Sequence, residues 1–171
     1  DAVQYGSYQI VDIEGQAFDK ALQITCKEVP EKDAKFIIYT NATPEKEKGA
    51  GISAKEKMLM AFRIRIVEGG DENGNGKIKI QVQHPETYKK AIFQEITATK
   101  DWTIIYLPFY GKEDATDIGI RPGYYNQVIE MGGIEILNFG EEYDVTKFPS
   151  SVRAEFDDLK PDAQWRKDAF E

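Results

Sequence analysis

The chain has 171 residues and a formal net charge of −8 at neutral pH. This length suffices for one domain whose core needs no metal ion or disulfide to hold it together. The negative charge disfavours nucleic acids and anionic membranes as partners, because both are bound through clustered Lys and Arg side chains. No apolar run approaches the ~20 residues that span a bilayer. We therefore expect no nucleic acid and no membrane as partners, whereas a neutral ligand meets no such obstacle.

Short stretches of alternating apolar and polar residues, bounded by Gly, Pro, Asn or Asp, predict strands throughout the chain. In chain order these strands are 8–13, 20–27, 35–40, 59–67, 77–83, 91–98, 102–109 and 126–137. About eight to ten short strands with turns between them predict an all-β fold, an antiparallel β-sandwich of the jelly-roll type. We expect the sandwich to occupy 1–147, and 148–171 to form a C-terminal strap and linker.

Two of these strands place polar side chains on one face. In the fourth predicted strand Arg63 and Arg65 alternate with apolar residues, and in the fifth Gln81 and Gln83 do the same. Successive side chains of a strand point to opposite faces, so these polar groups lie on the face away from the core. The Gly- and Asn-rich link 68–76 predicts a hairpin, which would set the polar groups side by side on one sheet.

The predicted strand 102–109 differs from the others because both of its faces are apolar. Such a strand is typical of the centre of a sheet. We expect Trp102 to pack inside, and Pro108 to break the hydrogen-bond ladder at the end of the strand.

No group of residues forms the constellation of an enzyme. The stretch 71–78 resembles the start of an EF-hand calcium loop, but position twelve is Val82 inside a strand, where a bidentate Glu is needed, so we expect a plain turn. His84 is the only histidine, which leaves neither a Ser-His-Asp arrangement nor a multi-histidine metal site. Cys26, the only cysteine, lies in an apolar strand and is expected to be buried and inert. The sequence predicts no catalytic residue, no metal site and no cofactor.

Aromatic and polar side chains suit the recognition of sugars. A sugar presents flat C–H faces and many hydroxyl groups, so rings that stack and planar amide or guanidinium groups bind it well. We expect tyrosines at strand ends or in loops to wall a groove and the polar side chains of two strands to form its floor. The wall would be Tyr39, Tyr88, Tyr124 and Tyr125, and the floor Arg63, Arg65, Gln81 and Gln83. The alternative is a sheet face on which Arg and Gln contact only water.

Five segments carry a resemblance to a known family. They are GQAFDKALQI (15–24), KFIIYTN (35–41), MAFRIRI (60–66), PETYKKAIFQEITATKDWTIIYLPF (85–109) and QVIEMGGIEILNFG (127–140). Their order and spacing resemble an accessory β-sandwich that precedes the catalytic barrel in some family 10 glycoside hydrolases, the xylanase family. That sandwich is related to carbohydrate-binding modules of families 4, 9 and 22. The closing PDAQWRKDAFE (161–171) is similar to the segment that joins such a sandwich to the next domain.

The resemblance implies a jelly-roll sandwich that holds a polysaccharide on its concave face without cutting it. By position it places Arg63 and Arg65 on the cleft-forming strand, and Gln127 and Glu130 at polar positions of the last strand. The chain departs from the family at Phe36, where many relatives have a tryptophan. Related modules also use an Asp for a structural calcium ion where residues 131–133 read Met-Gly-Gly, so that ion would lack a ligand here.

These observations predict a non-catalytic module of a polysaccharide-degrading enzyme, covalently linked to a catalytic domain. Its ligand would be a β-linked plant or algal cell-wall polysaccharide, with xylan or a mixed β-glucan favoured. We expect an extracellular or periplasmic location, because such polymers are too large to enter a cell. One alternative is a structural accessory domain that packs on the catalytic domain, through Trp165 and Phe170, without binding sugar. An enzyme in its own right is a further alternative, which turnover of a glycan would reveal.

Overall fold

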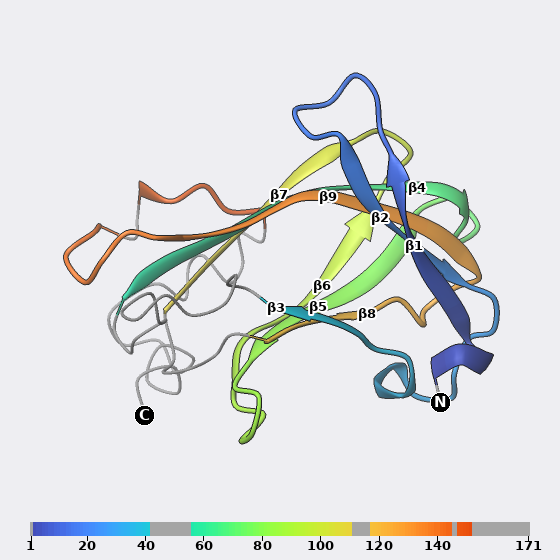
Figure 1. The fold of residues 1–171 in the computed structure, drawn as a ribbon, viewed down its shortest axis with the longest axis horizontal. Coiled ribbons are helices and arrows are strands. Elements are labelled where there is room, and N and C mark those ends of the chain that lie inside the picture. Colours follow the sequence, from blue (N-terminus) through green and yellow to red (C-terminus); the bar gives the residue numbers. More distant parts are fainter. Residues whose placement is uncertain (1, 42–55, 111–116, 145–146, 152–171) are drawn as a thin grey trace.

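The computed structural model describes residues 2–41, 56–110, 117–144 and 147–151 (Figure 1). Two short 3₁₀ helices, Ala2–Gln4 and Asp33–Lys35, accompany the strands, and neither is long and apolar enough to cross a membrane. The described strands are β1 (Gly6–Asp12), β2 (Lys20–Cys26), β3 (Ile38–Asn41), β4 (Lys57–Gly69), β5 (Gly76–Gln83), β6 (Lys90–Ala98), β7 (Thr103–Tyr110), β8 (Asp117–Arg121) and β9 (Gln127–Asn138).

The strands form two antiparallel sheets that lie one above the other in Figure 1. The five-stranded sheet has the order β1-β2-β9-β4-β7, and the four-stranded sheet the order β3-β8-β5-β6. Every described pairing is antiparallel, and neighbours such as β2 and β9 or β5 and β8 are distant in sequence. The predicted antiparallel β-sandwich is therefore confirmed.

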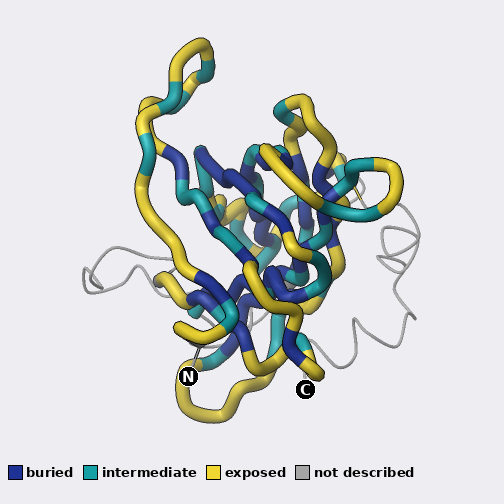
Figure 2. Tube along the Cα trace, turned by 90° about the vertical axis from the view of Figure 1, so that its right-hand side faces the viewer, coloured by how far each residue is buried: buried dark blue, intermediate teal, exposed yellow. Residues whose placement is uncertain are grey.

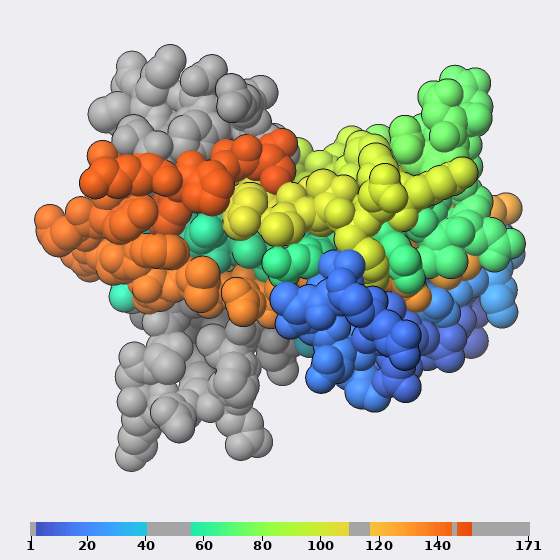
Figure 3. All heavy atoms as spheres, turned by 90° about the horizontal axis from the view of Figure 1, so that it is seen from above, coloured from blue at the N-terminus to red at the C-terminus, as the bar shows by residue number. Residues whose placement is uncertain are grey.

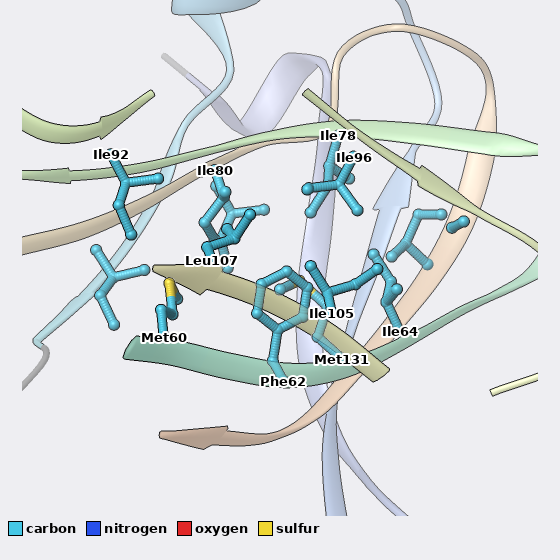
Figure 4. Close-up of a cluster of buried hydrophobic side chains, with 14 of the residues drawn as sticks. Met60, Phe62, Ile64, Ile78, Ile80, Ile92, Ile96, Ile105, Leu107 and Met131 are labelled. Carbon is cyan, nitrogen blue, oxygen red and sulfur yellow. The ribbon is translucent and has the colours of Figure 1, made fainter. Parts of the chain in front are cut away.

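Apolar side chains from both sheets meet between the layers. In β5 the core positions are Ile78, Ile80 and Val82, and β4 contributes Phe62 and Ile64, all at most 1% exposed. Figure 4 shows Ile78 and Ile80 of one sheet meeting Phe62 and Ile64 of the other, and Figure 2 shows the buried parts of the chain gathered at its centre. Each fully buried side chain of this size contributes about 1.5–3 kcal/mol to folding. The predicted alternation in both strands is confirmed, as is the burial of Cys26 (2% exposed).

The predicted hairpin between the fourth and fifth strands is wrong. β4 pairs with β7 and β9, whereas β5 pairs with β6 and β8, so the two strands belong to opposite sheets. The link between them carries the chain from one layer to the other. Its turn is closed by Asp71, whose Oδ1 accepts hydrogen bonds from the backbone N–H groups of Asn73 (2.8 Å) and Asn75 (2.9 Å). A turn-rich link of this kind permits either outcome, because it fixes a reversal of the chain but not the pairing partner.

The apolar strand β7 lies at the end of the five-stranded sheet rather than at its centre, which corrects the prediction. Its outer edge is covered by Ser151, whose N–H donates to the Tyr106 carbonyl (3.0 Å) and whose Oγ accepts from the Tyr106 N–H (2.8 Å). Pro108 does not end the strand, which continues to Tyr110, because a strand at the end of a sheet tolerates proline.

Aromatic side chains hold the start of the predicted C-terminal strap against the sandwich. Phe148 is 5% exposed and packs on Phe139 and Tyr143, with ring centroids 5.0 Å and 4.8 Å away. Residues 42–55 lie outside the described part of the chain, and so do Trp165, Phe170 and the linker-like segment 161–171.

Candidate functional site

The side chains predicted to form one groove are divided between the two sheets. Tyr39, Gln81 and Gln83 belong to the four-stranded sheet, and Tyr88 lies in the connection between its strands β5 and β6. Tyr124 and Tyr125 lie in the connection from β8 of this sheet to β9 of the other. Arg63, Arg65 and Glu130 belong to the five-stranded sheet, and Gln127 points into the interior. The single predicted groove is therefore wrong, because it rested on the hairpin that the fold does not form.

The outer face of the four-stranded sheet carries one row of residues across all its strands. Tyr39 of β3 pairs with Gly119 of β8, which pairs with Gln81 of β5. Gln81 in turn pairs with Phe93 of β6. Tyr39 is 54% exposed and Phe93 48%, whereas Gln81 is 1% exposed. We call these four residues the Gln81 row; its two rings lie three strand spacings, about 14 Å, apart.

The Gln81 side chain lies over Gly119. A Cβ atom at position 119 would come 2.7 Å from Cγ of Gln81, so the amide has room only because the neighbour is glycine. Nε2 of Gln81 donates to Oε1 of Gln83 (3.0 Å), and Oε1 of Gln81 accepts from Nε of Arg121 (2.9 Å). Gln83 is 3% exposed, and its own Nε2 has no partner within the described part of the chain. Gln81 in the row and Gln83 next to it on the same strand therefore form a fixed pair of amides with donor capacity left over.

Asp33, from the 3₁₀ helix before β3, anchors the same face. Its carboxylate accepts hydrogen bonds from Nη1 of Arg121 (3.2 Å) and from the Tyr124 hydroxyl (2.7 Å), and Lys79 Nζ lies 3.3 Å away. Burial raises the pKa of Asp33, but the hydrogen bonds from Tyr124 and Lys79 and the charges of Lys79 and Arg121 outweigh it, so the pKa lies below its ordinary value. Burial and the Asp33 carboxylate raise the pKa of Tyr124, which stays protonated as a donor. Tyr125, beside it, is half-buried.

Basic side chains surround the exposed ring of Phe93. The Nζ atoms of Lys79 and Lys90 lie 4.4 Å and 5.3 Å from the ring centroid, and the guanidinium carbon of Arg121 lies 4.9 Å away. Lys90 also donates to the carbonyl of Tyr88 (3.1 Å), a residue that is 62% exposed and has a left-handed φ of 59°. A tyrosine is rarely found in this backbone conformation, and here it stands two residues before Lys90, which begins β6.

The outer face of the five-stranded sheet carries a second polar row. Arg65 donates from Nε to Oε1 of Glu130 (2.8 Å), with Nη2 at 2.7 Å from the same oxygen. Gln23 donates to Oε2 of Glu130 (2.9 Å), and Gln9 donates to Oε1 of Gln23 (2.8 Å). Every polar group named here has its partner within the row, so this network is self-contained.

Aromatic rings close one end of that second row. The guanidinium of Arg65 stacks 4.7 Å from the Trp102 ring, and Phe18 meets Trp102 edge-on at 5.1 Å. Phe18 covers Gly132, where a Cβ would overlap its ring, and Arg63 lies 6.0 Å from it. In Figure 3 the blue loop that contains Phe18 reaches toward the yellow β7 across β4. Trp102 is thus half-buried on the outside of the sheet rather than in the core, a correction to the prediction.

Gln127 replaces a missing stretch of strand. β8 ends at Arg121, which pairs with Lys79, so no strand of the described part of the chain pairs with the Lys77 backbone on that side. The Gln127 amide accepts from the Lys77 N–H (3.0 Å) and donates to the Lys77 carbonyl (2.7 Å) and to the Pro122 carbonyl (2.8 Å). It is 3% exposed. The prediction that Gln127 contacts a sugar is therefore wrong. Its side-chain amide makes the hydrogen bonds that the peptide group of a neighbouring strand would make.

The remaining polar candidates serve turns. Nδ1 of His84 accepts from the backbone N–H groups of Glu86 (3.0 Å) and Thr87 (3.1 Å), and so closes the turn after β5. Asp71 closes the link after β4, as described above. Among the described residues there is no group of three or more His, Cys, Asp or Glu side chains that could hold a metal ion.

The sequence reasoning missed Phe93, Arg121, Lys79 and Lys90 as members of the four-stranded face. The strand 91–98 contains the signal for Phe93, since Ile92 and Ile96 are buried and the alternation turns Phe93 outward. Arg121 was missed with β8, a five-residue strand interrupted by Gly119.

Comparisons with known proteins place the fold. No family model matches the sequence, and no curated protein matches it. A structure of a family 4 carbohydrate-binding module (CBM4) is similar with a TM-score of 0.53 at 12% identity, over 78% of this chain and 79% of that one. The CBM22-1 xylan-binding domain of Paenibacillus barcinonensis Xyn10C gives a TM-score of 0.53 at 10% identity, over 79% and 82%.

A third structure contains the CBM22-1 and GH10 modules of the Clostridium thermocellum endo-1,4-beta-D-xylanase Xyn10B. Its TM-score is 0.53 at 12% identity, over 83% of this chain and 26% of that one. At these identities the likeness establishes the fold alone. The resemblance predicted from the five sequence segments is confirmed at that level: the chain has the β-sandwich fold of carbohydrate-binding modules.

Proposed function

We propose that the chain is a non-catalytic carbohydrate-binding module whose ligand lies along the Gln81 row of the four-stranded sheet. The ligand class is a β-linked plant or algal cell-wall polysaccharide, with xylan or a mixed β-glucan favoured. In this proposal the sugar rings stack on Phe93 and Tyr39, and the amides of Gln81 and Gln83 bind hydroxyl groups between them.

One observation carries the proposal: two exposed rings flank a buried amide pair. Exposed aromatic side chains in one register row on a sheet are costly to leave in water, and they offer flat apolar surfaces of the kind that C–H faces of sugars cover. The Gln81 amide is held by Arg121, which Asp33 fixes in turn, and Gln81 holds the Gln83 amide, so both are positioned before a ligand arrives. Positioned donors lose little conformational entropy on binding, which raises affinity.

The second polar row, on the five-stranded sheet, fits a structural role better. Both oxygens of the Glu130 carboxylate already accept hydrogen bonds, and Arg65 is held between Glu130 and Trp102. A sugar hydroxyl would have to displace one of these contacts. We therefore propose the four-stranded face as the binding surface and leave Arg63, Arg65 and Glu130 out of it.

The structural neighbours support this class of function. One of them is described as a xylan-binding domain, and another is a binding module joined to a GH10 xylanase module in complex with xylohexaose. By the same reasoning the parent protein of this chain would be a glycoside hydrolase that acts outside the cell or in the periplasm. A tethered module of this kind raises the effective concentration of substrate for its catalytic neighbour, even when each site binds weakly.

Affinity gel electrophoresis tests the proposal against xylans, mixed-linkage β-glucan, galactomannan, pectins and sulfated algal galactans. The expected result is retardation by at least one polymer, about tenfold weaker in Phe93→Ala and in Tyr39→Ala, because each loses one stacking contact. Both side chains are about half exposed, so the fold tolerates their removal.

Arg63→Ala is the matched variant on the opposite sheet. It removes a half-buried side chain without breaking the Glu130 network, and it should leave retardation unchanged. Loss of binding in Arg63→Ala with full binding in Phe93→Ala would move the site to the five-stranded sheet. No retardation by any polymer would favour the structural accessory domain.

A further inference from the structure

Positive charge gathers at one end of the Gln81 row, on a chain whose net charge is −8. Lys79, Lys90 and Arg121 all lie within 5.3 Å of the Phe93 centroid. A ring face attracts each of these cations, but it does not neutralise them. The end of the row around Phe93 is therefore a cationic aromatic patch, which we call the Phe93 patch.

The carboxylates of this face do not balance the patch. Asp33 forms ion pairs with both Lys79 and Arg121, so one negative charge neutralises only one of these two positive charges. Glu95 pairs with Lys77, at 2.9 Å. Asp117 shares a register row with Gln83 and, among the described residues, forms no ion pair with a cation of this face.

Lys90 is the cation of the Phe93 patch that no carboxylate of the described residues neutralises. Among the described residues it has no carboxylate partner, and its ammonium group donates only to the Tyr88 carbonyl. Burial lowers the pKa of Lys90, and the charge of Arg121 lowers it further. The positive charges of Lys90 and Arg121, which both lie beside the Phe93 ring, therefore repel each other, and an anion placed between them would relieve that repulsion.

We propose that the Phe93 patch selects polysaccharides that carry carboxylate groups: a uronic acid unit stacks on Phe93 and its carboxylate lies between Lys90 and Arg121. This inference rests on the proposed function and narrows its ligand to an acidic, β-linked polymer such as a xylan substituted with glucuronic acid. Lys90 contacts the ligand in this proposal, whereas Asp33 positions Arg121 for it.

A pair of polymers that differ only in charge tests the inference. Glucuronoxylan is compared with the same polymer after its carboxyl groups have been reduced to alcohols, by affinity electrophoresis and by titration calorimetry. We expect the reduced polymer to bind five- to tenfold more weakly, a smaller loss than the tenfold or more expected for a buried charged hydrogen bond, because the charges of this face are partly exposed to water. The preference should also shrink at high salt, because partly exposed charges are screened.

Lys90→Gln and Lys100→Gln form the matched variants. Both remove one positive charge, but Lys100 is an exposed residue beyond the far end of β6, about 30 Å along the strand from Lys90. Lys90→Gln should lose the preference for the acidic polymer and keep the binding of the reduced one, whereas Lys100→Gln should keep both. Since Lys90 is only half-buried, the variant should fold normally, which its thermal unfolding checks.

Each outcome has a distinct meaning. Equal binding of the two polymers, or a preference that survives Lys90→Gln, overturns the inference but leaves the proposed function intact. Binding of neither polymer, nor of any neutral glycan, overturns the proposed function itself. Tighter binding of a sulfated galactan than of glucuronoxylan would overturn the assignment to carboxylate and identify sulfate ester as the anion recognised.

Discussion

Replacing Gln127 with leucine removes three hydrogen bonds that close the sandwich beside β5. Leucine has a similar volume, so the change deletes polar atoms without opening a large cavity. The atoms left without their partner are the N–H and C=O of Lys77 and the C=O of Pro122. Water cannot easily replace the amide, because Gln127 is 3% exposed.

The expected loss in the free energy of unfolding follows from the three backbone groups that lose their hydrogen-bond partner. A buried backbone group without a partner costs about 1–3 kcal/mol, and a carbonyl that still finds a partner costs less. The Lys77 side chain is 32% exposed, so water has partial access at this residue. Taking about 1 kcal/mol for each group gives a loss of about 3 kcal/mol in the free energy of unfolding.

Urea denaturation followed by tryptophan fluorescence measures this loss, and hydrogen exchange of the Lys77 amide localises it. Gln9→Leu is the control, because Gln9 is exposed and makes one hydrogen bond to another side chain. We expect a loss below 0.5 kcal/mol for the control, as for most surface substitutions. A loss below about 1 kcal/mol for Gln127→Leu, with unchanged exchange at Lys77, would refute the view that its amide replaces a strand.

Three further substitutions probe the two faces. Gly119→Ala places a methyl group against the buried Gln81 side chain. It should weaken polysaccharide binding severalfold in affinity electrophoresis and, because Gln81 must shift, cost about 1–3 kcal/mol of stability. Asp33→Asn should reduce the acid sensitivity of folding. Because the pKa of Asp33 is lowered in the folded state, its stabilising contribution is complete above about pH 4 and is lost as pH falls through the folded-state pKa. Urea denaturation at neutral and at acid pH measures this loss. Glu130→Gln should cost about 1–2 kcal/mol, less than a fully buried ion pair, because the Arg65 side chain is 34% exposed.

Each of these expectations has a result that contradicts it. Unchanged binding by Gly119→Ala would mean that Gln81 is not a contact of the ligand. An equal loss of stability in acid for the parent and for Asp33→Asn would mean that other carboxylates account for it. Loss of polysaccharide binding in Glu130→Gln, with little loss of stability, would assign the ligand to the five-stranded sheet.

The strands and their faces could be predicted because the information is local. The alternation in β5 placed Ile78, Ile80 and Val82 in the core and turned Gln81 and Gln83 away from it, as the structure has them. β8 was missed because five residues with a central glycine give too short a pattern.

The site could not be predicted in the same way, because strand pairing is not local. Arg65 and Gln81 are close in sequence and both turn away from the core, yet they lie on opposite outer faces. The neighbour of Gln81 across the strands is Gly119, which alternation within one strand cannot reveal. The role of Gln127 depends on where β8 ends, which is a property of the folded sheet.

The most direct test of the central claim is a titration with xylan-derived oligosaccharides, followed by ¹⁵N–¹H NMR. If the Gln81 row binds the ligand, the side-chain amides of Gln81 and Gln83 and the backbone amide of Gly119 should shift with a common dissociation constant. The indole N–H of Trp102, on the opposite sheet, should stay unchanged. Shifts at Trp102 and at the Gln23 side-chain amide, with none at Gln81 or Gly119, would contradict the account.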